Sequence, residues 1–93
     1  MANLTTKIES LISNWCDVEA GSYEATATLR SLWSRRHPVS PPYETNGAPS
    51  LVNKIHSKFE GCPDAQEISV GYFLLGGGIQ TVSDLHDFLT PCA

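Results

Sequence analysis

The stretch that decides the fold is VGYFLLGGGIQTVSDLHDFL, residues 70–89, the most apolar segment of this 93-residue chain. Three consecutive glycines at 76–78 interrupt it and supply the backbone freedom that a tight reversal requires. Thr81 follows as a candidate helix N-cap, and apolar residues then recur at helical spacing as far as Leu89. The stretch therefore predicts two helices that meet at a glycine corner.

The arm before this corner has both helical and strand character. Pro63 suits the first turn of a helix, and Asp64 and Glu67 place negative charge near that helix's N-terminus. We therefore expect a buried helix from residue 62 or 63 to residue 75. Residues 68–75 (ISVGYFLL) are also β-branched and aromatic enough for a buried strand. No other segment offers a convincing partner strand, so the helix is favoured and an α+β fold is the alternative.

Three further helices are predicted upstream. Apolar residues recur every three or four positions between residues 4 and 15, which predicts a first helix over about 5–16. Ser22 can cap a second helix that ends at Arg36, because a residue before proline disfavours the helical conformation. Ser50 can cap a third, which Gly61 ends.

The predicted architecture is all-α, with four to five short helices in a single compact domain spanning residues 1–93. We divide it into a helical pair (4–36), a Pro-rich loop (37–49) and a helical group (50–89). The loop holds four of the six prolines and is longer than most connections between helices. We expect it to contact a partner.

Composition predicts a folded protein of the cytoplasm. The chain is 41% hydrophobic and 17% charged, which is too apolar for wholesale disorder. It contains neither a membrane-span-sized apolar run nor a secretory signal at its N-terminus. The three cysteines are odd in number and far apart, which indicates reduced thiols. A delivered or phage protein would instead reach a host cytoplasm.

Charge is unevenly distributed along the chain, whose net charge is −4. Residues 30–58 are basic, whereas residues 59–93 contain five acidic residues and no Lys or Arg. The blocks either neutralise one another in the fold or present charged surfaces to a partner.

The residues around the Pro-rich loop form the candidate partner-binding site. Trp, Tyr and Arg most often dominate the binding energy of interfaces. Arg35, Pro38 and Pro41 also match the R-x-x-P-x-x-P pattern of peptides that bind as polyproline II helices. For Trp33, core packing is the alternative. The candidate residues are Arg30, Trp33, Arg35, Arg36, Pro38, Pro41 and Tyr43.

Catalytic, metal-binding and cofactor motifs are not recognisable. No CxxC or HxxxH pair, phosphate loop or nucleophile elbow occurs, so we expect no enzyme, no metal and no cofactor. A small thiol enzyme that pairs Cys62 with His56 is the third interpretation.

The segment GIQTVSDL, residues 78–85, resembles the second half of a helix-hairpin-helix unit, in which the amides of a glycine corner approach a nucleic-acid phosphate. Gln80 stands where that family has its second corner glycine, and no cation follows Lys58 to bind a phosphate. We therefore expect a structural corner.

The sequence as a whole favours a small acidic protein-protein interaction module: an adaptor, subunit, or inhibitor or immunity-type protein of bacterial or phage origin. Its partner protein could be a basic nucleic-acid-processing enzyme. The alternative is a helical domain that binds nucleic acid through the basic segment 30–58, provided that the fold gathers those cations on one face. We expect no membrane partner, and the oligomeric state is left open.

Overall fold

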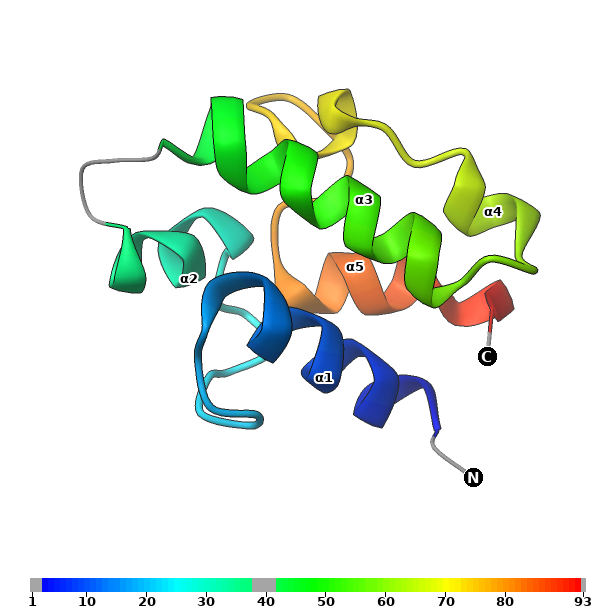
Figure 1. Ribbon diagram of the computed structural model, residues 1–93, viewed down its shortest axis with the longest axis horizontal. Coiled ribbons are helices and arrows are strands. Elements are labelled where there is room, and N and C mark those ends of the chain that lie inside the picture. The colour runs from blue at the N-terminus through cyan, green and yellow to red at the C-terminus, as the bar shows by residue number, and fades with distance from the viewer. Residues whose placement is uncertain (1–2, 38–41, 93) are drawn as a thin grey trace.

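The computed structural model describes residues 3–37 and 42–92. It contains five α-helices and no strand within those residues, which confirms the all-α prediction (Figure 1). The α-helices are α1 (Leu4–Cys16), α2 (Leu29–Arg36), α3 (Ala48–Lys58), α4 (Pro63–Gln66) and α5 (Val82–Phe88). Three short helical turns accompany them: the π-helical η1 (Tyr43–Gly47) and the 3-10 helices η2 (Val70–Phe73) and η3 (Thr90–Cys92).

The core contains the apolar faces of α1, α3 and α5, together with buried side chains of α2, η1 and η2. α1 contacts α2, α3 and α5, and α3 also contacts η1, α4 and η2. In Figure 1 α2 lies at one end of the molecule, and α3 runs from there toward α4 at the other end. Every buried side chain of the described residues is hydrophobic. Burial of apolar area therefore dominates the stability of the fold.

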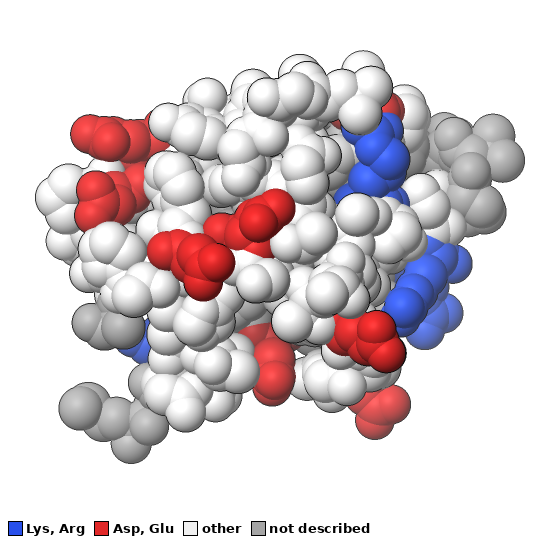
Figure 2. Space-filling view, turned by 180° about the vertical axis from the view of Figure 1, so that it is seen from behind, with Lys and Arg blue, Asp and Glu red and all other residues white. Residues whose placement is uncertain are grey.

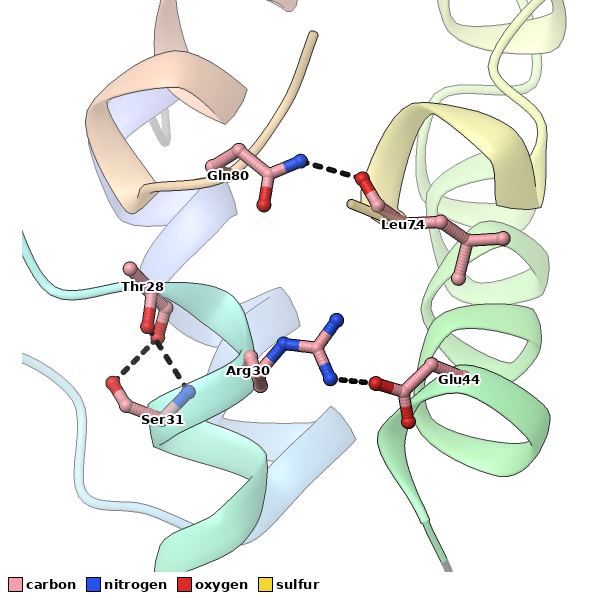
Figure 3. Close-up of polar contacts among 6 residues, drawn as sticks. All are labelled: Thr28, Arg30, Ser31, Glu44, Leu74 and Gln80. Atoms are coloured by element: carbon pink, nitrogen blue, oxygen red, sulfur yellow. Dashed lines mark hydrogen bonds and ion pairs between the residues drawn. The ribbon is translucent and has the colours of Figure 1, made fainter. Parts of the chain in front are cut away.

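α2 begins later than predicted, because Thr28 rather than Ser22 is its N-cap. The Thr28 hydroxyl accepts a hydrogen bond from the backbone N–H of Ser31 at 3.2 Å (Figure 3). Residues 17–28 are irregular instead of helical. The carbonyls of Ala25 and Ala27 accept hydrogen bonds from the backbone of α5, so this segment satisfies its polar groups through tertiary contacts.

The predicted helix begins at Pro63 as expected, but its extension to residue 75 is wrong, and so is the alternative strand at 68–75. α4 ends at Gln66, whose side-chain amide donates to the carbonyls of His56 and Phe59. Nε2 of the His56 ring lies 2.9 Å from the carbonyl oxygen of Ile68. The contact with His56 thus occupies the Ile68 carbonyl, which a longer helix would pair internally, and the Gln66 side chain ties the end of α4 to the end of α3. Leu75, predicted to be buried, is 85% exposed.

The glycine corner before α5 is held by hydrogen bonds within itself. The Gln80 side-chain amide donates to the carbonyl of Leu74 at 2.7 Å (Figure 3). It also donates to the carbonyl of Gly77 at 3.1 Å. The Gly77 amide donates to Leu74, and the Ile79 amide donates to the Tyr72 carbonyl. These two amides are therefore already used, which fits the expected structural corner.

α5 begins as predicted, with Thr81 as its N-cap. Thr81 and Asp84 form a capping box, in which each side chain accepts a backbone N–H of the other residue. Backbone hydrogen bonds from Thr81 and Gln80 lower the pKa of the Asp84 carboxyl, so it stays ionised at neutral pH.

The N-termini of α2 and α5 are joined through their backbones. Thr28 and Thr81, the two N-caps, form an isolated antiparallel bridge. The amide of Leu29 donates to the Gln80 carbonyl, and the amide of Val82 donates to the Ala27 carbonyl. This pairing fixes segment 17–28 against the start of α5.

Cys62 and Cys92 form a disulfide, so the prediction of reduced thiols is wrong for these two residues. The bond joins the start of α4 to η3 and links positions 30 apart in the sequence. Spacing along the chain did not indicate it, because the fold alone brings α4 and η3 into contact. Cys16 is a buried free thiol, and burial raises its pKa to about 11.

Across the described residues, each helix is too short or too polar to cross a bilayer.

Candidate partner-binding surface

Two of the predicted partner-binding residues belong to an aromatic cluster made of Trp15, Trp33 and Tyr43. Trp33 is 6% exposed and Tyr43 is 4% exposed. The ring centroids of Trp15 and Trp33 lie 5.3 Å apart, and those of Trp15 and Tyr43 lie 6.2 Å apart. Such aromatic contacts stabilise the packing of α1, α2 and η1. Trp33 and Tyr43 are therefore placed in the core, which is the alternative that the sequence left open for Trp33.

Gly47 in η1 is what allows the cluster to close. Its carbonyl accepts a hydrogen bond of 2.7 Å from the indole Nε1 of Trp15. A Cβ at position 47 would lie 2.8 Å from Cδ2 of Trp33, closer than side-chain atoms approach one another. The ring of His37 stacks on the other side of this assembly, with its centroid 3.9 Å from that of Trp33.

The predicted arginines are largely engaged within the molecule. Arg30 forms an ion pair with Glu44 (Figure 3), and its guanidinium carbon lies 4.9 Å from the centroid of the Tyr43 ring. Nε of Arg36 donates to the carbonyl of Asp17 at 3.0 Å. Arg35 is exposed at the C-terminal end of α2. Pro38 and Pro41 lie outside the described residues.

The cations of segment 30–58 are spread over the length of the molecule. Arg30, Arg35 and Arg36 belong to α2, at one end of the view in Figure 1. Lys58 ends α3 near α4, at the opposite end. The arginines of α2 are therefore separated from Lys58, whereas nucleic-acid binding draws its affinity from cations clustered on one face or along one helix.

We use the name acidic surface for the five acidic residues that follow Lys58 and lie on or beside α4 and α5: Glu60, Asp64, Glu67, Asp84 and Asp87. Four of them are exposed, and Asp84 is half-buried at the start of α5. Figure 2, the view from behind, colours all Asp and Glu residues of the chain and shows acidic side chains across much of that face, with most of the visible basic ones on its right side. Among the described residues the one ion pair is Arg30–Glu44, so these carboxylates are not neutralised by a cation of the fold.

A second feature is a hollow of about 330 Å³ between α1, segment 17–28 and α5. We call it the Glu9 hollow. α1 contributes Ile8 and Glu9 to its lining, segment 17–28 contributes Tyr23, and α5 contributes Val82 and His86. Ile8 and Val82 are buried and make part of the lining apolar. The volume is at the lower end of the range typical of ligand pockets, roughly 300–1,000 Å³, and suits a group of side-chain size.

Polar groups of all three segments surround this hollow. The Thr5 hydroxyl and Nε2 of His86 lie 3.3 Å apart and connect α1 to α5. The Tyr23 hydroxyl oxygen is buried and has no hydrogen-bond partner in the described part of the chain. Burial, and secondarily the negative charge of Glu9, raises the pKa of Tyr23 to about 12. Tyr23 is therefore neutral at physiological pH, and Glu9 is the one carboxylate that lines the hollow.

Residues 3–37 and 42–92 contain no cluster of metal-ligating side chains, and the predicted pair of Cys62 and His56 is not brought together as a thiol and its base. No group of three or more His, Cys, Asp or Glu side chains there is arranged to hold a metal ion. The Cys62 sulfur is bonded to Cys92, and the His56 ring contacts a backbone carbonyl. The pair proposed for a thiol enzyme is thus differently engaged.

No protein-family model, curated protein or solved structure matches this chain.

The sequence missed the Glu9 hollow because its lining comes from three distant segments. Glu9 is an ordinary position on the polar side of a predicted helix, and Tyr23 was assigned to a helix that does not form there. The acidic block after Lys58 was visible in the sequence, and the structure adds that four of its five carboxylates are exposed.

Proposed function

We propose that the protein is a small acidic interaction module that binds a basic partner protein through the acidic surface. The observation that supports this most directly is charge segregation. Five carboxylates and no cation follow Lys58, and four of these carboxylates are exposed on or beside α4 and α5.

The physical basis is electrostatic complementarity. Unpaired carboxylates on one surface attract a positively charged partner over about 10 Å at moderate ionic strength, which raises the association rate and disfavours acidic competitors. Neutralising them within the fold would remove this effect. Within residues 3–37 and 42–92 no cation forms an ion pair with the acidic surface, which is consistent with a role in binding.

The working environment that we propose is oxidising, in place of the cytoplasm that the sequence suggested. Disulfides persist in oxidising compartments and are rare where glutathione and thioredoxin keep thiols reduced. The Cys62–Cys92 bond supports this change.

The test compares two triple variants of equal charge change. The test variant is D64N/E67Q/D87N, which removes three exposed charges of the acidic surface. The control variant is D17N/E19Q/E24Q, which removes three exposed charges from the segment after α1. Each tagged protein is used to capture binding partners from an extract of its source, with and without nuclease, and affinity for a captured protein is then measured at several salt concentrations.

We expect a stoichiometric protein of basic pI that survives nuclease treatment. Its affinity should fall roughly tenfold or more for the test variant, and much less for the control, because only the first set faces the partner. Equal losses for both variants would show a non-specific charge effect and would refute the proposed surface. Binding that disappears with nuclease would instead support the nucleic-acid alternative.

A further inference from the structure

We propose that the Glu9 hollow is a binding site for a cationic side chain, the ammonium of a lysine or the guanidinium of an arginine, supplied by the partner protein. The inference deepens the proposed function, because it names the chemical group that a basic partner would insert and the residue that would receive it.

The shape and lining of the hollow fit a long side chain with an apolar stem. Ile8 and Val82 provide buried apolar surface, which can cover the methylene groups of such a stem. The hydroxyls of Thr5 and Ser83 provide hydrogen-bond acceptors in the same lining. An aliphatic chain that ends in N–H donors can use both kinds of surface.

The charge of the hollow selects a cation. Glu9 lines it, and none of the described Lys or Arg side chains does. Glu9 also has no ion-pair partner among residues 3–37 and 42–92. It is only half-exposed, so a cation that enters the hollow would meet a partly desolvated carboxylate. Charge-assisted hydrogen bonds of this kind are shorter and stronger than those between neutral groups.

The position of the hollow makes it accessible beside the acidic surface. α5 contributes Val82, Ser83 and His86 to the hollow and also carries Asp84 and Asp87 of the acidic surface. The capping box at Thr81 and the backbone bridge to Thr28 hold this part of α5 in place. A partner that docks on the acidic surface could therefore place one of its cations in the hollow.

The experiment uses n-butylguanidinium as the probe and n-butylurea as its neutral counterpart. Each is titrated into the oxidised, isotopically labelled full chain, and backbone amide shifts are followed by NMR. The guanidinium probe should give saturable shifts at residues 5–9, 21–25 and 82–86, with a dissociation constant in the millimolar range. The urea probe should bind at least roughly fivefold more weakly, because it cannot pair with a carboxylate.

Three variants separate the contribution of charge from that of shape. Glu9→Gln removes the counter-ion and should weaken guanidinium binding by roughly fivefold while leaving butylurea unaffected. Glu24→Gln removes a charge that does not line the hollow and should bind as the unmodified protein does. Ala25→Leu should block both probes, because it fills the space without altering the charge.

Guanidinium binding that is unchanged in Glu9→Gln, or that butylurea matches, would overturn the proposal, and so would the absence of saturable shifts at the three segments. The proposed function can fail separately. Probe binding that depends on Glu9, together with partner affinity that is insensitive to D64N/E67Q/D87N, would establish the hollow and refute the acidic surface.

Discussion

Substitution by alanine should change the free energy of unfolding by a different amount at each of the three consecutive glycines of the corner. A Cβ at Gly77 would lie 2.3 Å from the carbonyl oxygen of Tyr72 and 2.5 Å from that of Gly71, both of which are backbone atoms. Gly76 has open space around it but adopts φ +85. At Gly78 the nearest atom would be Cδ1 of Tyr72 at 4.0 Å, an ordinary contact.

These distances set the expected magnitudes. Gly77→Ala must displace the Tyr72 carbonyl, which accepts the Ile79 amide, so overpacking and a weakened hydrogen bond together cost about 3 kcal/mol. Gly76→Ala should cost about 1 kcal/mol, because alanine is strained in the left-handed region. Gly78→Ala should be neutral or stabilise by about 0.5 kcal/mol, because alanine lowers the entropy of the unfolded chain.

The measurement is urea denaturation of the oxidised protein, followed by far-UV circular dichroism and by the fluorescence of the buried tryptophans Trp15 and Trp33. With an m-value of about 1 kcal/mol/M, Gly77→Ala should lower the midpoint by about 3 M. Gly78→Ala serves as the matched control. A loss at Gly77 below about 1 kcal/mol, or an equal loss at Gly78, would refute the described geometry of the corner.

Other consequences of the structure can be tested by the same means. Reduction of the Cys62–Cys92 bond should lower the free energy of unfolding by about 3.6 kcal/mol, because residues 30 apart are no longer tied in the unfolded chain. Denaturation with and without reductant measures this difference. Burial is the largest cause that raises the pKa values of Tyr23 and Tyr43 to about 12, from 10.0. The folded state therefore binds these protons more tightly, and the contribution of the two tyrosines to stability should be constant below pH 10 and be lost between pH 10 and about 12. Absorbance titrations of the two Tyr→Phe variants and melting curves would show this difference from the unmodified protein. Thr81→Ala should cost about 1 kcal/mol through loss of the capping box, whereas Thr81→Ser should retain most of it.

Local signals in the sequence were reliable where a helix depends mainly on its own residues. α1 has a long apolar stripe, and its observed range of Leu4–Cys16 matches the predicted one within a residue. The start of α5 was also correct, because Thr81 and Asp84 satisfy the helix N-terminus without help from elsewhere. In both cases the determining interactions lie within a few residues.

Helix boundaries predicted from the sequence were wrong where contacts with distant segments compete with the local preference of the residues for helix. Ser22 is of a residue type that often caps a helix, yet no helix starts there. Two carbonyls of segment 17–28 instead accept hydrogen bonds from backbone amides of α5, and α2 starts only after Thr28. Gln66 and His56 end α4 early through contacts with carbonyls of other segments. The Cys62–Cys92 bond and the Glu9 hollow depend on the same long-range arrangement, so no short pattern could have predicted them.

The backbone bridge between Thr28 and Thr81 bears on how quickly this protein folds. Most helical domains fold fast because their contacts are local and their relative contact order is low. Here the starts of two helices pair across more than half of the chain, and closing so long a loop costs entropy before the pairing is gained. We expect α1 and α3 to associate first and the bridge to form after the main barrier. Thr28 and Thr81 would then show low φ-values, and substitutions there would mainly accelerate unfolding.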